Sequence, residues 1–538
     1  MLHPSIAIFL SIPLLMAAYK TDKIFAAISI LSPIIAACFV FFLPFREVFY
    51  FNKIEIIFDG QYINKLISFS LIAVLLCGNL FALSANKKQE LVLGSCYMGL
   101  AILCALAGDF ITLIISLEMM MLISTSIIYI SDPENNIKTA ANYFITHFIS
   151  GSLIMAGATF LLFTNKYGFT NLLDAFSFDA KASSYIYMIL TGLIINLAAF
   201  PFSGWMVNYY KKASYSGFIF LISGTSKVSL LILLKFFAGL GMLKWLGIIV
   251  MIYSAFNMLF ENNFKSMLSL FSIFVVGFLL IGISLANNEL IREIIGYYLA
   301  ILILYKLILS LCAGIYFEKN NIESCDQVSK IRGPYFIIPL ILGLLTMINF
   351  PGTALFFFKS TITASLHEQL VYYFILLMPV IALCSLPLKR IIDSKSYNYL
   401  ELDVFSKSSL LVVTFIILLL QVILINSLKP DLSLLGIILQ AAIIGIGCLI
   451  SIKLKIKRKE TQPINVIEII GKIVLRLINT INYNHKLSNE NNEVVTLAEI
   501  ISSSTKFFAK HHNQKNSIII VLVIFLILFA STWWQVIR

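Results

Sequence analysis

The sequence is poor in charged residues and lacks the short motifs that bind nucleotides, metals or iron–sulfur clusters. Only 12% of its 538 residues are charged, against about 25% in a soluble domain. It contains no GxxxxGK[ST] phosphate loop and no GxGxxG sequence after a strand-like run. The eight cysteines form no CxxC pair, and we interpret them as small buried hydrophobic residues. We therefore expect no cofactor and no metal site, and nucleotide-driven transport by this chain alone is disfavoured.

The positive net charge does not point to a nucleic acid. The formal net charge is +12, but no basic run is interleaved with aromatic residues. In a membrane protein an excess of Lys and Arg mostly reports on orientation. We therefore expect no nucleic-acid partner.

Long apolar runs dominate the chain. Hydrophobic residues make up 59% of it and the mean hydropathy is +0.93, which predicts an all-α polytopic membrane protein. Runs of about 20 apolar residues, the length needed to cross a bilayer, predict about sixteen transmembrane helices. These lie at 4–19, 24–45, 63–84, 89–107, 109–130, 139–163, 184–207, 216–239, 243–260, 266–287, 293–316, 334–358, 369–388, 408–428, 432–452 and 516–536. The first run has no basic leader and no small-residue cleavage site, so we expect it to be a retained span.

Basic residues are concentrated in alternate loops. The loops after odd-numbered spans hold most of them, for example Lys87 and Lys88, and residues 453–459. The positive-inside rule then predicts that the N-terminus lies outside. Residues 46–62 are too polar to span a membrane, and they predict a short outer-surface hairpin or a re-entrant segment.

Two predicted spans contain an interior proline, Pro201 in the seventh and Pro351 in the twelfth. Proline removes a backbone hydrogen bond and clashes with the preceding turn, and the freed carbonyls must meet protein or water. We therefore expect two broken helices beside a pathway, with packed proline kinks as the alternative. Because the breaks are five spans apart, they predict an inverted repeat of two five-helix units.

The predicted domain boundaries follow from these features. They are helices 1–3 at residues 1–88, the two five-helix repeats at 89–240 and 241–392, helices 14 and 15 at 393–456, an amphipathic lateral segment at 457–515, and a terminal transmembrane helix at 516–538. The lateral segment is predicted because its apolar residues recur at three- and four-residue steps. A cytoplasmic tail with two short helices is the alternative for that segment.

Four ionisable residues lie well inside predicted spans: Glu118, Lys227, Lys306 and Lys359. A charge at the centre of a bilayer costs at least ~2.5–3.5 kcal/mol, so each one needs a partner or a task. A row of such groups fits a proton relay, in which Glu118 changes protonation as its distance from Lys227 changes. The alternatives are structural ion pairs, snorkelling lysines and, for His147 in the sixth span, a hydrogen-bonded core histidine.

Seven stretches within residues 105–360 resemble one family and stand in its order. They are GDFITLIISLEMM, ANYFITHFISGSLIMAG, AAFPFSGWMVNYYKKAS, GTSKVSLLILLKFF, ENNFKSMLSLFSIFVVGFLLIGIS, YKLILSLCAG and NFPGTALFFFK. The chain here resembles the proton-pumping antiporter-like membrane subunits of NADH:quinone oxidoreductase (complex I) and of Mrp-type multisubunit cation/proton antiporters, the Mrp D-type subunit most closely. The resemblance implies an inverted pair of five-helix bundles with a row of buried charges. It matches Glu118, Lys227, Lys306 and Lys359 with charged residues of the family's fifth, eighth, eleventh and twelfth helices.

Three positions depart from the family pattern. Asn196 stands where the family usually has a lysine, and Ser203 and Leu302 stand where it often has histidines. Asparagine carries no proton at neutral pH. Either Lys227 takes over the central role in this half, or transport is weakened.

The favoured hypothesis is a proton-translocating membrane subunit of a multisubunit Mrp-like antiporter or complex-I-like assembly, in a bacterial inner membrane. Its relay residues would be Glu118, Lys227, Lys306 and Lys359, with Na+/H+ exchange left open. Its partners would be other hydrophobic subunits, the lipid bilayer and protons. The alternatives are a divergent scaffold subunit with weakened or lost transport, and a stand-alone secondary transporter for a small solute. Any dehydrogenase activity would belong to an assembly and not to this chain.

Overall fold

The computed structural model describes residues 3–51, 54–164, 184–320, 324–328, 330–366, 369–386, 397–399, 402–428 and 434–453, with Pro463, Val466 and Ile469. All of these except Ile469 belong to one compact unit, Met1–Val466. The predicted terminal span lies outside the described residues. So does the predicted lateral segment, apart from the three single residues just named.

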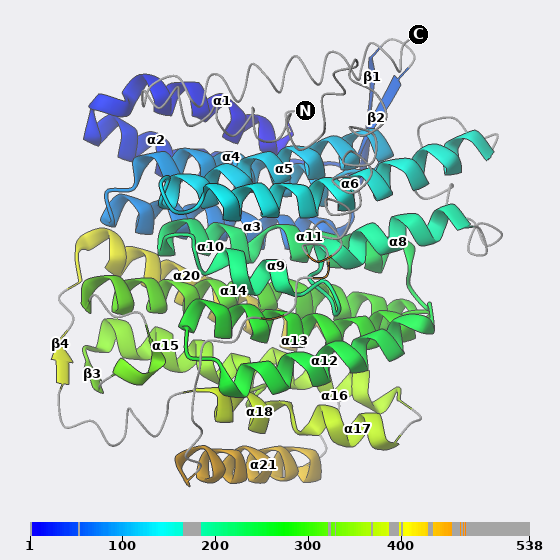
Figure 1. Ribbon diagram of the computed structural model, residues 1–538, viewed down its shortest axis with the longest axis vertical. Helices are drawn as coiled ribbons and strands as arrows, with labels where there is room; N and C mark the ends of the chain where they lie inside the picture. The colour runs from blue at the N-terminus through cyan, green and yellow to red at the C-terminus, as the bar shows by residue number, and fades with distance from the viewer. Residues whose placement is uncertain are drawn as a thin grey trace, which may run out of the picture. The chain divides into compact units, whose positions relative to one another are not determined.

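Helices make up most of the described chain, because a helix satisfies its own backbone hydrogen bonds in lipid. They are α1 (Pro4–Ala17), α2 (Asp22–Phe42), α3 (Tyr62–Ser84), α4 (Lys88–Ala105), α5 (Phe110–Ser131), α6 (Ile137–Thr164), α8 (Ser184–Asn196), α9 (Gly204–Tyr210), α10 (Tyr215–Ser223), α11 (Thr225–Phe236), α12 (Met242–Phe260), α13 (Phe264–Leu285), α14 (Glu289–Asn320), α15 (Pro334–Met347), α16 (Ala354–Ala364), α17 (Gln369–Leu376), α18 (Met378–Ser385), α20 (Val404–Leu428) and α21 (Leu434–Lys453). Short 3-10 turns are η1 (Ala18–Lys20) and η3 (Cys325–Gln327). Within the compact unit the long helices lie side by side with similar axis directions (Figure 1).

Ten helical segments of the described chain are long and apolar enough to cross a membrane. This confirms a mostly helical, polytopic membrane protein, while the count of sixteen spans, the domain boundaries and the inverted repeat stay predictions. The apolar stretches of α10–α11 and α14 are completely buried, whereas only 33% of those of α2 and α20 are buried. Helices α10, α11 and α14 therefore lie in the interior of the compact unit, whereas most of the apolar residues of α2 and α20 lie on its surface.

Both predicted helix breaks are present. The seventh span divides into α8 and α9 around Pro201, and the twelfth divides into α15 and α16 around Pro351. Side chains add hydrogen bonds to carbonyls at the end of α8: the Trp205 indole donates to the Ile195 carbonyl at 2.8 Å, which also accepts from the Ala198 amide, and the Ser150 hydroxyl donates to the Gly192 carbonyl at 2.6 Å. Polar groups of α6 and α9 therefore lie beside the first break, as expected for a broken helix in a membrane.

The two breaks share one backbone pattern. In the first break, the amides of residues 197, 198, 199 and 202 donate to the carbonyls of residues 193, 195, 194 and 199, respectively. In the second break, the amides of residues 348, 349, 350 and 353 donate to the carbonyls of residues 344, 346, 345 and 350, respectively. Ala198 and Asn349 both adopt positive φ, +56° and +52°, as the residue after a helix does in a Schellman ending. Equivalent hydrogen bonds in the two breaks are 151 residues apart in the sequence. Pro201 and Pro351 are 150 residues apart, so the two prolines do not occupy equivalent positions.

The eighth predicted span contains a break that no proline signals. Helix α10 ends at Ser223 and α11 begins at Thr225, with Gly224 between them. A Cβ atom on Gly224 would overlap the ring of Tyr97 from α4. Only glycine allows this close approach of the tyrosine ring to the backbone.

The segment predicted to be a hairpin forms one. Strands β1 (Arg46–Phe51) and β2 (Ile54–Asp59) pair antiparallel. The Ile57 amide donates to Asp109 Oδ2 at 2.9 Å, and the Asp59 amide donates to the Leu106 carbonyl at 2.8 Å. These bonds attach β2 to the junction of α4 and α5. A second, parallel pair joins β3 (Lys330–Arg332) to β4 (Tyr397–Tyr399).

The packing of α3, α4 and α10 makes a testable prediction. The buried Phe220 ring of α10 fits between Gly78 and Gly94, and a Cβ atom on either glycine would overlap it. We expect Gly94→Leu to lower the free energy of unfolding by about 1–3 kcal/mol, because the ring has no room to move. The measurement is the melting temperature of the purified protein in detergent.

The matched control is Gly241→Leu. Gly241 precedes α12, and nothing lies within 4 Å of a Cβ atom built on it. We expect a change of no more than about 0.5 kcal/mol there. Equal melting temperatures for the two variants would contradict the proposed packing.

Candidate functional site

Glu118 lies on α5 with its carboxylate against α6. A Cβ atom on Gly151 of α6 would overlap this carboxylate, so the glycine makes room for it. None of the ion pairs among the described residues involves Glu118 or Lys227. The expected ion pair between these two residues is therefore not formed, because Glu118 faces α6 and not α11.

His147 lies on α6, one turn before Gly151, and is buried. Its Nδ1 is 2.8 Å from Oδ1 of Asn196, and its ring packs on Tyr143 and Trp205 with centroids 4.3 and 4.4 Å apart. The prediction of a hydrogen-bonded core histidine is confirmed. Its partner is the asparagine that stands at the family's lysine position. Within the described residues, His147 Nε2 is buried and has no hydrogen-bond partner.

Three buried tyrosines extend this cluster toward α11: Tyr143 of α6, Tyr210 of α9 and Tyr97 of α4. The rings of Tyr143 and Tyr210 are 6.0 Å apart. The hydroxyls of Tyr143 and Tyr210 are buried and have no hydrogen-bond partner among the described residues. The Tyr97 hydroxyl is 2.7 Å from Thr225 Oγ1 and accepts from the Thr225 amide at 2.8 Å. A polar cluster thus runs from α6 to the start of α11.

Lys227 is completely buried near the start of α11. Its ammonium group donates to Ser226 Oγ at 2.9 Å and to Ser272 Oγ of α13 at 2.7 Å. Lys306 of α14 is also buried, and its Nζ has no hydrogen-bond partner among the described residues; the two lysines influence each other electrostatically. Two adjacent ammonium groups repel strongly in an apolar interior, so one proton shared between the two amines costs less energy than two charges. The geometry therefore allows proton exchange between α11 and α14.

Lys359 is buried on α16, just after the second break. Its ammonium group donates to Oε1 of Gln440 from α21 at 3.0 Å. A second glutamine, Gln421 of α20, donates to Thr346 Oγ1 at 3.2 Å. Sequence reasoning missed Gln440, although a lone glutamine in an apolar helix was the available signal.

The remaining departures from the family pattern are also buried. Ser203 lies just before α9, and Leu302 lies on α14 one turn before Lys306. Leucine offers no proton-carrying group there. The interior next to Lys306 is therefore less polar than the family pattern implies.

One buried ion pair was not predicted. Lys235 of α11 lies 3.3 Å from Asp59 of β2, and the side chains are 12% and 11% exposed. The Lys235 ammonium group also donates to the carbonyls of Ala105 and Ala107 at 3.3 and 3.4 Å. The pair joins residues that are far apart in the sequence, which gives no local signal for it. It secures the hairpin against the central helices.

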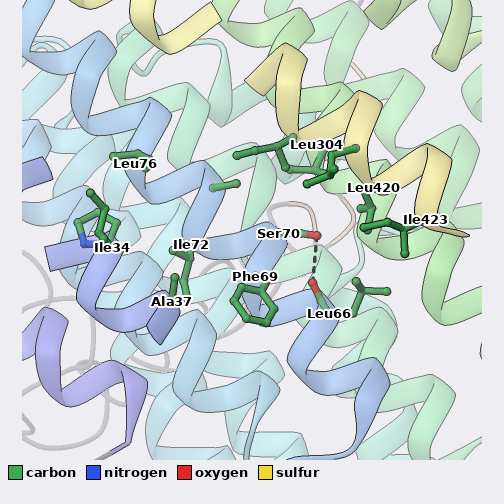
Figure 2. A pocket seen from close by; sticks show the side chains of 14 residues that line it. Ile34, Ala37, Leu66, Phe69, Ser70, Ile72, Leu76, Leu304, Leu420 and Ile423 are labelled. Atoms are coloured by element: carbon green, nitrogen blue, oxygen red, sulfur yellow. Dashed lines mark hydrogen bonds between the residues drawn. The ribbon is translucent and has the colours of Figure 1, made fainter. Parts of the chain in front are cut away.

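An apolar cavity of about 300 Å³ lies between α2, α3, α14 and α20. Figure 2 shows its hydrocarbon lining, in which the Ser70 hydroxyl donates to the carbonyl of its own helix at Leu66, at 3.1 Å. None of the buried charged residues lines it. Because an ion would find no ligand there, this cavity is not the candidate site.

Comparisons with known proteins converge on one family. Residues 107–384 match the family model described as NADH:quinone oxidoreductase/Mrp antiporter, transmembrane. The chain is 24% identical over 401 residues to NADH-quinone oxidoreductase subunit N of Pelagibacter ubique, which covers 69% of this chain and 83% of that protein. This relative is a subunit of NADH-quinone oxidoreductase, so the expected closeness to the Mrp D-type subunit stays a prediction.

Two solved structures share the fold. A chain of the membrane-bound sulfane sulfur reductase, an archaeal respiratory membrane complex, has a TM-score of 0.69 at 16% identity and covers 84% of this chain and 98% of that one. A chain of the Mrp complex from Dietzia sp. DQ12-45-1b has a TM-score of 0.63 at 13% identity and covers 84% and 96%. At these identities the likeness concerns the fold alone.

The Lys235–Asp59 pair yields a prediction about stability. We expect Lys235→Met to lower the free energy of unfolding by about 3 kcal/mol, because it leaves a buried carboxylate without its counter-charge. The double variant Lys235→Met/Asp59→Asn should be more stable than that single variant. Melting temperatures in detergent measure both.

The control is the exposed pair of Lys88 and Asp22, which are 2.6 Å apart with Asp22 86% exposed. Lys88→Met should cost no more than about 1 kcal/mol. A double variant less stable than Lys235→Met alone would contradict the assignment of a buried, mutually dependent pair.

Proposed function

The chain belongs to the NADH:quinone oxidoreductase/Mrp antiporter transmembrane family, and from this premise we propose that it is a proton-translocating membrane subunit of a multisubunit assembly. The observation that carries the proposal is the burial of Lys227 and Lys306, neither of which takes part in an ion pair among the described residues. Burying basic groups without a counter-charge is costly. Such a cost is expected where the amines have a task, and passing a proton is one.

The proposed relay has a beginning, a centre and an end on separate helices. Glu118 of α5 takes a proton at the α5–α6 contact. Lys227 and Lys306 exchange one proton between α11 and α14, assisted by the hydroxyls of Ser226 and Ser272. Lys359 of α16, oriented by its bond to the buried Gln440, is the last member. Assigning these four charged residues to the relay is part of the proposal.

Electrostatic repulsion supplies the coupling between the two central lysines. Two unit charges 4 Å apart repel by about 4 kcal/mol at an effective dielectric constant of about 20. A proton arriving on one amine therefore favours the departure of the proton on the other. Any event that moves a charge toward Lys227 or Lys306 would shift the position of that proton along the membrane interior.

The surroundings of the chain are proposed on the same basis. We place it in a bacterial inner membrane with its N-terminus outside, as its distribution of basic loop residues favours. Its partners would be other hydrophobic subunits of an Mrp-like or complex-I-like assembly. Sodium exchange is a separate question that ion competition in the flux assay would answer.

Removing any one member of the charged row should strongly reduce proton transport. We expect Glu118→Gln, Lys227→Ala and Lys359→Ala each to lower proton flux by about tenfold or more, because each removes a proton-carrying group from the path. The measurement is quenching of a pH-sensitive dye in vesicles that contain the assembled complex. Lys138→Ala, an exposed lysine on α6, is the control and should retain wild-type flux.

Two outcomes would overturn the proposal. Wild-type flux in both Glu118→Gln and Lys359→Ala would remove the charged row from the path. An assembled wild-type complex without flux would instead support the scaffold alternative, and a gain of flux in Asn196→Lys would strengthen that conclusion.

A further inference from the structure

We propose that His147, held by Asn196, is the proton-carrying group of the α5–α9 half, and that the hydroxyls of Tyr143, Tyr210 and Tyr97 connect it to the helix break before Lys227. This inference rests on the proposed proton transport. It names the residues that would carry a proton between Glu118 and Lys227. Glu118 and Lys227 form no ion pair, so a proton must cross the space between them by other groups.

The hydrogen bond of His147 fixes which nitrogen is free. Asn196 Oδ1 is an acceptor, so the Nδ1 atom 2.8 Å away carries the hydrogen and donates it. Nε2 is then the basic atom, and it is buried without a partner among the described residues. Asn196 cannot take up a proton itself, but it orients a neighbour that can. His147 Nε2 would accept one proton and give the same proton up again.

Helix α6 places His147 next to Glu118. Tyr143, His147 and Gly151 are four residues apart and lie on one face of the helix. The Glu118 carboxylate fills the space at Gly151, about 6 Å along the helix axis from His147 at ~1.5 Å per residue. The Glu118 carboxylate and His147 therefore lie at adjacent turns of the same face of α6.

The described groups in contact with the imidazole are Tyr143 of its own helix, the neutral Trp205 of α9 and the neutral Asn196 of α8. Tyr210 of α9 packs on Tyr143, and the Glu118 carboxylate of α5 lies at Gly151, one turn along α6. The residue at position 196 is the one that bonds the ring, so we expect it to have the larger effect on the titration of His147.

In the proposed path, the hydroxyls of Tyr143, Tyr210 and Tyr97 connect this face of α6 to the start of α11. A hydroxyl group both donates and accepts a hydrogen bond. The hydroxyls of Tyr143 and Tyr210 have no hydrogen-bond partner among the described residues, so in the proposed path each bonds a neighbouring hydroxyl or a water molecule when the proton passes. Tyr97 ends the row on Thr225, and Lys227 donates to the next residue, Ser226. A packing cluster would need the aromatic rings but not their hydroxyls, and this difference separates the two interpretations.

The experiment compares ring-preserving variants in the assembled complex. We expect Tyr210→Phe and Tyr143→Phe to lower proton flux in vesicles by about tenfold at an unchanged melting temperature. Tyr316→Phe removes the hydroxyl of another buried tyrosine, on α14, and should leave flux unchanged. Because His147→Phe leaves Asn196 without its partner, His147→Leu/Asn196→Leu is the variant that removes both polar groups together, and it should also lose flux.

A pH profile provides the readout that a structural role would not move. Asn196→Asp places a carboxylate on Nδ1 and favours the protonated imidazole, so the midpoint of flux against pH should shift by about one unit to higher pH. An unchanged midpoint, together with full flux in Tyr210→Phe and in His147→Leu/Asn196→Leu, would overturn this inference. Loss of flux in Lys227→Ala in the same experiment would show that the proposed function stands while the histidine route fails.

Discussion

A backbone carbonyl without a hydrogen-bond partner is too costly to leave in lipid, and this constraint organises the interior of the protein. Helix α8 ends at Asn196, and its last turns accept donors from neighbouring helices as well as from its own backbone. The Ile195 carbonyl accepts from the Trp205 indole and from the Ala198 amide, and the Gly192 carbonyl accepts from the Ser150 hydroxyl. The two side-chain donors bring α6, α8 and α9 together. The same arrangement brings the His147 ring against Trp205 and its Nδ1 against Asn196.

The buried charges follow from the same constraint. Lys227 stands just after the glycine break between α10 and α11, where serine hydroxyls accept its hydrogen bonds. Lys359 stands just after the break between α15 and α16, where Gln440 accepts from it. Lys227 is the third residue of its helix and Lys359 the sixth of its own. The buried Lys306, by contrast, lies within the unbroken helix α14, so a break accompanies two of the three buried lysines of the row.

The sequence was informative wherever the signal was local. The apolar runs predicted the helices, the polar stretch at 46–62 predicted a hairpin, and Pro201 and Pro351 predicted both breaks. Contacts between helices could not be predicted from the sequence, because residue spacing along one helix does not show which of its faces packs on which neighbouring helix. Glu118 was therefore paired with Lys227, although it faces Gly151. For the same reason the sequence did not reveal the bonds of Asp59 with Lys235 and of Gln440 with Lys359, which depend on the packing of distant segments.

The two helix breaks have the same pattern of backbone hydrogen bonds, but the side chains that pack beside them differ. At the spacing of 151 residues that relates their hydrogen bonds, His147 corresponds to Tyr298. Each ring comes from the helix packed beside its break and bonds an asparagine there, His147 to Asn196 at 2.8 Å and Tyr298 to Asn349 at 3.4 Å. An imidazole exchanges protons near neutral pH, whereas a phenol, with an ordinary pKa of about 10, does not. Of the two breaks, only the first therefore has a group beside it that titrates near neutral pH. Under the proposed function, this difference assigns the proton-carrying role at the first break to His147, and it leaves Asn196 the role of orienting the imidazole.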